Sequence, residues 1–270
     1  MKKIRDHLVT GVFGRRTLMF LPLREKCSLT IGETYTSKQL YDKVACLSKC
    51  PPDDGSVRVF KSLSNVLLGN DCDCTSVVEV LSSGYIDLSW VTNITAKARI
   101  ITVRRVVDPI QAILEAESTV NSRGFGYYTM YTLEDIMERM GVKSEELPDT
   151  VTEPVYGYKC LLGNMTSIYG TKKYEIGKEE VERGPLVMCQ VGMHFSRRLS
   201  DAIAWTNKKL EVPIRFFRCK AYGRVYDYCD GTKAIASKLV ITEEISRRDA
   251  DSIIEKEKTE KMIEAAGVAS

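Results

Sequence analysis

The feature that most restricts the fold of this chain is a pattern in its first half that returns in its second half. Four short segments recur in the same order: 29–35 with 174–179, 60–67 with 195–203, 77–84 with 216–223, and 99–103 with 238–242. The last two pairs share one offset of 139 residues. Conserved order and a shared offset are typical of a repeated unit, so the sequence predicts two copies of one domain. Two unrelated halves with similar strand chemistry are the alternative.

Local patterns indicate the same elements in each copy. Runs rich in β-branched residues predict strands at 76–81 and 98–107, and again at 214–222 and 236–245. The loops between these late strands are too short for crossover helices, which favours antiparallel pairing. A short helix is expected to precede each pair of strands. The predicted fold class is therefore α+β, with two tandem related domains, each a small, mostly antiparallel sheet packed on one or two helices.

A connector and a charged tail complete the predicted organisation. Thr132 and Asp135 have the spacing of a capping box, and Gly141 ends the helix that follows. The tail carries apolar residues near helical spacing, which predicts a helix suited to a partner or to a second copy of the chain. The chain is therefore predicted to consist of a first domain at 1–107, a helical connector at 108–153, a second domain at 154–246 and a charged C-terminal helix at 247–270.

Composition excludes several classes of protein. Hydrophobic residues make up 44% of the 270, and the net charge is only +3. That content can build a core, while so small a charge does not predict nucleic-acid binding. Basic residues between 197 and 218, with Trp205 nearby, are interpreted as a solvated surface. No apolar run has the length of a membrane span, and the charged N-terminus does not predict a secretory signal.

Four of the nine cysteines form a candidate metal site. Cys46, Cys50, Cys72 and Cys74 follow the spacings C-x3-C and C-x-C, and four thiolates could close a tetrahedral zinc site. Both spacings depart from the usual C-x2-C. Buried or incidental cysteines in a reducing compartment are the alternative interpretation.

Few residues qualify for catalysis. No phosphate-binding glycine motif is complete, and the chain has two histidines. His194 lies at the end of a predicted strand, and Val59 stands in its place in the first copy, which favours a packed histidine over a catalytic one. Cys189 lies five residues before His194 and is a conceivable thiol partner.

The second copy resembles a small domain found in many uncharacterised bacteriophage and prophage proteins. The resemblance covers 157–246, and its motifs are Tyr-Lys-Cys at 158–160, Tyr-Glu-Ile-Gly-Lys at 174–178, Gly-Met-His-Phe-Ser at 192–196, a strand at 217–225 and Ile-Thr-Glu-Glu-Ile at 241–245. Ser196 replaces a cysteine of that pattern, and Arg218 and Lys220 replace two acids. The resemblance implies a phage origin and carries no activity.

A second resemblance is to the NAD-binding core of ADP-ribosyltransferases. It implies NAD as cofactor and a late-strand glutamate that stabilises an oxocarbenium-like centre, for which Glu243 or Glu244 is the candidate. Lys159 stands where that family has a first-strand histidine or arginine.

Together these observations predict a phage-encoded, non-enzymatic binding or structural protein with two docking surfaces. We expect a host or virion protein as partner, self-association through the C-terminal helix, no nucleic acid and no membrane. The expected location is the host cytoplasm or the virion. An NAD-dependent ADP-ribosyltransferase is the second interpretation, and a zinc-stabilised interaction domain is the third.

Overall fold

The chain forms two compact units. The computed structural model describes 17–23, 29–40, 57–60, 63–68, 75–83, 87–88, 95–98, 100–122, 132–206 and 213–267. Unit 1 comprises Met1–Ala116 with Tyr128–Glu146, and unit 2 comprises Glu117–Tyr127 with Leu147–Ser270. The boundary falls inside helix α3 (Pro109–Ser122), so the predicted connector is divided between the units.

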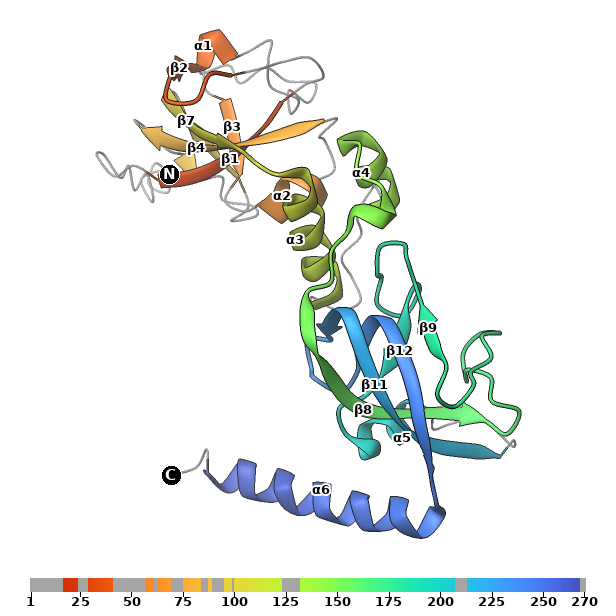
Figure 1. The fold of residues 1–270 in the computed structure, drawn as a ribbon. Helices are drawn as coiled ribbons and strands as arrows, with labels where there is room; N and C mark the ends of the chain where they lie inside the picture. The colour runs from red at the N-terminus through yellow and green to blue at the C-terminus, as the bar shows by residue number, and fades with distance from the viewer. Residues whose placement is uncertain are drawn as a thin grey trace, which may run out of the picture. The chain divides into compact units, whose positions relative to one another are not determined.

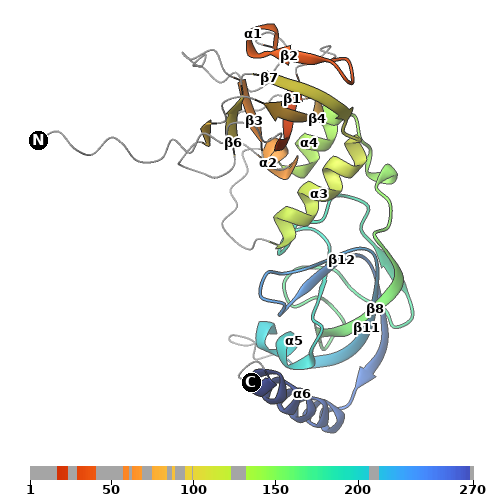
Figure 2. The same ribbon diagram turned by 90° about the vertical axis from the view of Figure 1, so that its left-hand side faces the viewer.

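Unit 1 is built on an antiparallel sheet (Figures 1 and 2). Its described strands run in the order β2-β7-β4-β1-β3-β6-β5. Their bounds are β1 (Thr17–Leu23), β2 (Thr34–Thr36), β3 (Val57–Phe60), β4 (Ser76–Ser83), β5 (Asp87–Leu88), β6 (Thr95–Ala98) and β7 (Ile100–Val106). The unit also contains α1 (Ser37–Leu40), α2 (Leu63–Leu68), α4 (Leu133–Met140), a 3-10 turn (Ser144–Glu146) and the first half of α3. Alternate strand residues such as Leu21, Val80 and Ile101 form its buried core, as expected where one face of a pleated strand is inward.

Unit 2 has a second antiparallel sheet with longer strands. The order is β10-β12-β11-β8, and β9 also pairs with β12. The bounds are β8 (Val151–Leu162), β9 (Glu179–Val181), β10 (Met193–Phe195), β11 (Ile214–Asp227), β12 (Ala234–Ile245), α5 (Leu199–Thr206) and α6 (Arg247–Gly267). One face of the sheet carries a core that includes Leu161, Phe217 and Leu239. A second cluster joins α5 to the first turns of α6 through Leu199, Ile245 and other apolar side chains.

The two units share a strand pattern, and the predicted α+β class with tandem domains is confirmed. In unit 1, β4 lies between β1 and β7, and β2 pairs with the far side of β7. In unit 2, β11 lies between β8 and β12, and β9 pairs with the far side of β12. The short helices α2 and α5 follow β3 and β10 in the same places of the chain.

The turn before β2 and the turn before β9 match in detail. Gly32 and Gly177 both have a positive φ, of 86° and 80°. The N–H of Gly32 donates to the Val103 carbonyl, and the N–H of Gly177 donates to the Ile241 carbonyl, each at 2.8 Å. Because glycine adopts this conformation at little cost, the isoleucine–glycine pair seen in both halves of the sequence has a structural reason.

The offset of 139 residues predicted between the two copies is wrong for their last strands, β7 and β12. Both sheets have a register shift at the corresponding place, between Glu79 and Val80 in β4 and between Arg218 and Cys219 in β11. Val80 pairs with Val103, whereas Cys219 pairs with Ile241, so the last strands correspond with an offset of 138. A single residue is easily misassigned from similar β-branched runs, yet it moves each side chain to the other face.

An ion pair beside this shift has its charges reversed between the units. Arg105 donates to Glu79 across β7 and β4, with nitrogen–oxygen distances of 3.0 and 3.1 Å. At the corresponding cross-strand positions, the Arg218 Nε lies 2.7 Å from a Glu243 oxygen. Cross-strand neighbours of opposite charge stabilise a sheet in either order, so the exchange preserves the interaction.

The helices follow their sequence signals. Thr132 and Asp135 form a reciprocal capping box at the start of α4, and Gly141 ends it with φ 68°. A turn at Asp230-Gly231, where Gly231 has φ 68°, connects β11 to β12. The charged tail forms helix α6, in which Ile253 and Ile254 are half-buried. None of the described helices is long and apolar enough to cross a membrane.

Candidate functional site

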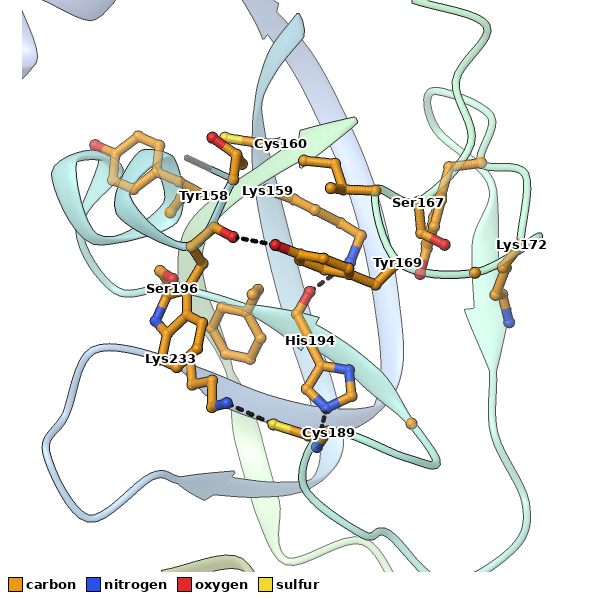
Figure 3. Close-up of a pocket in the computed structure, with 18 of the residues that line it drawn as sticks. Tyr158, Lys159, Cys160, Ser167, Tyr169, Lys172, Cys189, His194, Ser196 and Lys233 are labelled. Atoms are coloured by element: carbon orange, nitrogen blue, oxygen red, sulfur yellow. Dashed lines mark hydrogen bonds between the residues drawn. The ribbon is translucent and has the colours of Figure 1, made fainter. Parts of the chain in front are cut away.

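A cavity of about 680 Å³ opens in unit 2. Its walls come from β8, β10, α5, the segment 167–172 and the segment 189–192 (Figure 3). These parts are far apart in the sequence and meet because the end of β10 bridges to β8, where Tyr158 and Ser196 exchange backbone hydrogen bonds. Gly157 makes this approach possible: a Cβ there would lie 2.5 Å from the Ser196 carbonyl oxygen. The cavity is of the size that holds small ligands.

Lys159 on β8 is the most unusual residue of the cavity wall. It is only 8% exposed, and its Nζ donates to the backbone carbonyl of His194 and lies 4.8 Å from the centre of the Tyr174 ring. No carboxylate pairs with it among the described residues. Burial lowers the pKa of Lys159 from 10.5 to about 8, and the neighbouring Lys172 adds to the effect. A buried ammonium group without a counter-ion is costly, and such residues are frequent at functional sites.

The corresponding residue of unit 1 is Leu21. Lys159 pairs with Phe217 across β8 and β11, while Leu21 pairs with Val78 across β1 and β4. The partners Phe217 and Val78 directly precede Arg218 and Glu79, after which the register shift described above occurs. Leu21 is fully buried. The sheet architecture that the two units have in common therefore accepts an apolar residue at this position. The positive charge of Lys159 is a feature of unit 2 alone.

Two further lysines line the same cavity. Lys172 is paired with Glu180 at 3.3 Å and is 37% exposed. Lys233 is buried; its Nζ lies 3.8 Å from the centre of the Trp205 ring and donates to the Cys189 sulfur. Among the described lining residues the one carboxylate belongs to Glu182. The wall thus carries more positive than negative charge.

His194 lies in the cavity wall as a neutral imidazole. Its Nε2 accepts a hydrogen bond from the Cys189 N–H at 2.7 Å, so its proton is on Nδ1. Burial lowers the pKa of His194 to about 4, and the nearby Lys159 and Lys233 contribute. The histidine and Cys189, five residues apart in the sequence, are therefore neighbours, but the contact runs through the Cys189 backbone.

Aromatic side chains form much of the remaining surface. Tyr169 is 77% exposed, and its hydroxyl donates to the Trp205 carbonyl at 2.9 Å. Figure 3 shows Tyr169 and Lys159 among the side chains that line the cavity. Tyr174 and Phe195 also line the cavity, and both are buried. A flat apolar ligand could contact these rings while its charge meets a lysine.

The other predicted site residues lie elsewhere. Glu243 and Glu244 are exposed on β12 and pair with Arg218 and Arg215, and neither lines the cavity. Cys46, Cys50, Cys72 and Cys74 lie outside the described residues. In the part of the chain that the structure describes, no group of three or more histidine, cysteine, aspartate or glutamate side chains could hold a metal ion.

Comparison with known proteins gives one family. Residues 155–253 match a family described as Domain of unknown function (DUF7666). The match covers most of unit 2, including β8 from Val155 onward, β10 and the residues that line the cavity. No curated protein and no solved structure matches this chain.

Sequence reasoning missed most of this site. It noted Lys159 only through the two family resemblances, and it assigned no role to Lys172 or Lys233. One signal was available: Lys159 occupies an inward position, two residues before the core residue Leu161. A lysine at an inward position of a strand is rare enough to mark a candidate site.

Proposed function

We propose that unit 2 binds a small organic anion and that the chain is a binding protein. The observation that carries the proposal is the buried Lys159, which has no carboxylate partner among the described residues and lines a cavity. A bound anion would supply the missing counter-charge, and its hydrogen bonds to a buried ammonium would be charge-assisted.

The rest of the cavity supports an anion with an apolar portion. Lys172 and Lys233 add positive charge, and His194 stays neutral near pH 7 because its pKa is about 4. Tyr169 and Trp205 provide exposed aromatic surface. Ligand sites commonly combine apolar walls with a few polar groups that fix orientation.

The geometry gives less support to the ADP-ribosyltransferase interpretation. That chemistry requires a carboxylate close to the reacting sugar. Glu243 and Glu244 are engaged by arginines outside the cavity. The phage origin, a host or virion protein partner and self-association through α6 remain proposals from the sequence. They are compatible with an anion receptor, since ligand occupancy could regulate a docking surface.

A fluorescent organic anion tests the proposal. 1-Anilinonaphthalene-8-sulfonate and N-phenyl-1-naphthylamine share a ring system, and only the former carries a sulfonate. We expect the full chain to bind the sulfonate more tightly than the neutral compound. Lys159→Met should weaken sulfonate binding about 10- to 100-fold, the equivalent of about 1.5–3 kcal/mol for a hydrogen bond to a charged group, and leave the neutral compound unaffected.

Lys178→Met is the matched control. Lys178 lies in unit 2, is well exposed and pairs with Glu175 away from the cavity wall. Its replacement should not change the affinity for either compound. Equal affinities for the two compounds, or equal losses in Lys159→Met and Lys178→Met, would contradict the proposal.

A further inference from the structure

We propose that the Lys159 amine forms an imine with an anionic aldehyde or ketone that enters the unit 2 cavity. This inference rests on the proposed function, because it assigns a carbonyl group to the anion. It adds a covalent step that anion binding alone does not require.

The geometry places an amine where a bound molecule would reach it. Lys159 lines the cavity, and its Nζ makes one described hydrogen bond, to the His194 carbonyl. Figure 3 shows the hydrogen bond from the Lys159 Nζ to that carbonyl, and the Nζ also lies 4.8 Å from the centre of the Tyr174 ring. The surrounding groups are aromatic rings, a neutral histidine, other lysines and the thiols of Cys160 and Cys219. Burial raises the pKa of both thiols to about 12, so they are uncharged. No described carboxylate therefore holds the nitrogen in its charged form.

The same surroundings favour the nucleophilic form of the amine. A free amine attacks a carbonyl carbon, while an ammonium group does not. With a pKa of about 8, a substantial fraction of Lys159 is uncharged near pH 7.5, whereas a lysine at 10.5 is almost wholly charged. Burial of a lysine is one of the established ways in which proteins make this nucleophile available.

The reaction needs no oxidant or reductant. The Lys159 nitrogen adds its electron pair to the carbonyl carbon, and one of its own two hydrogens moves to the carbonyl oxygen to give a carbinolamine. The hydroxyl group then leaves as water with the second amine hydrogen, and the carbon–nitrogen double bond remains. Lys172 and Lys233 would meet the negative charge of the incoming molecule, which selects an anionic carbonyl compound over a neutral one.

Reductive trapping tests the proposal. The full chain is incubated at pH 7.5 with glyoxylate and cyanoborohydride, which reduces an imine to a stable carboxymethyl amine, and labelled lysines are identified by peptide mass spectrometry. Lys159 should be labelled at least about tenfold faster than exposed lysines such as Lys178 and Lys256, given its larger uncharged fraction. Labelling should rise with pH to half its maximum near pH 8.

Two comparisons separate this inference from the proposed function. Acetaldehyde, which is neutral, should label Lys159 less than glyoxylate does, and excess anilinonaphthalene sulfonate should slow labelling. Lys159→Arg retains the charge and should keep sulfonate binding while the label is lost from this site. Sulfonate binding with no excess labelling of Lys159 would overturn the imine and leave anion binding intact. Rapid labelling without preference for glyoxylate, together with no sulfonate binding, would contradict the proposed function.

Discussion

Replacing Arg224 by methionine is expected to lower the free energy of unfolding of unit 2 by about 3–5 kcal/mol, because it leaves a buried carboxylate without its partner. The Arg224 Nε lies 3.0 Å from a Glu117 oxygen, and the side chains are 4% and 0% exposed. Glu117 also accepts hydrogen bonds from the Leu186 N–H and the Tyr226 hydroxyl. These contacts tie the second half of α3 into unit 2. Hydrogen exchange of the β11 and β12 amides in urea would measure the loss for this unit.

The loss in Arg224→Met should shrink as the pH falls. Burial raises the pKa of Glu117 above 4.5, and Arg224 opposes that effect, so removing the arginine raises the pKa further. The folded variant then binds a proton more readily than the unfolded chain, and its stability rises as the pH is lowered from 7 towards 5. Arg197→Met is the control, because the pair with Asp227 is 38% and 51% exposed. It should cost about 0.5 kcal/mol or less, and an equal loss in both variants would contradict the account.

Replacing Lys159 by leucine, the residue that unit 1 has at this position, is expected to stabilise unit 2 by about 1–3 kcal/mol at pH 7. A pKa of about 8 instead of 10.5 means that folding disfavours the ammonium form by about 3 kcal/mol, and the lost hydrogen bond to His194 offsets part of the gain. The same variant should lose sulfonate binding. Greater stability with lost binding is the usual sign of a strained functional residue.

The gain in Lys159→Leu depends on pH in a defined direction. Between pH 8 and 10.5 the folded wild type has lost the Lys159 proton while the unfolded chain retains it, so wild-type stability rises with pH. The leucine variant lacks this rise, and its advantage should shrink from pH 7 to pH 10. Lys178→Leu, at an exposed site, should change stability by less than about 0.5 kcal/mol at either pH. A destabilised Lys159→Leu variant would show that the lysine supports the fold.

Much of the fold could be predicted because it depends on local and repeated patterns. The isoleucine–glycine turn, the capping box of α4 and the β-branched strands each have a signal within a few residues. The predicted correspondence between the last strands of the two copies, β7 and β12, was wrong by one residue because both strands carry several interchangeable apolar residues in succession. Only the cross-strand pairing, with its shift between Arg218 and Cys219, fixes which of them face the core.

The site was harder to predict because its parts come together through tertiary structure. Lys172 lies in an irregular segment and Lys233 follows a turn, and nothing in their local sequence distinguishes them from surface lysines. Both lysines line a cavity whose walls meet where β10 bridges to β8, and that contact depends on the tertiary fold. Glu243 and Glu244 had a clear sequence signal, yet strand register places them among exposed arginines. Motif position alone did not determine which residues share a cavity.

The pKa of Lys159 in the full chain tests the central claim most directly. Lysines labelled with carbon-13 at Cε report their protonation by NMR, and Lys159→Arg identifies the signal. We predict a pKa of about 8 without ligand, and a rise when anilinonaphthalene sulfonate binds, because an anion stabilises the ammonium form. A pKa near the ordinary value of 10.5 that does not change with the sulfonate would contradict the account.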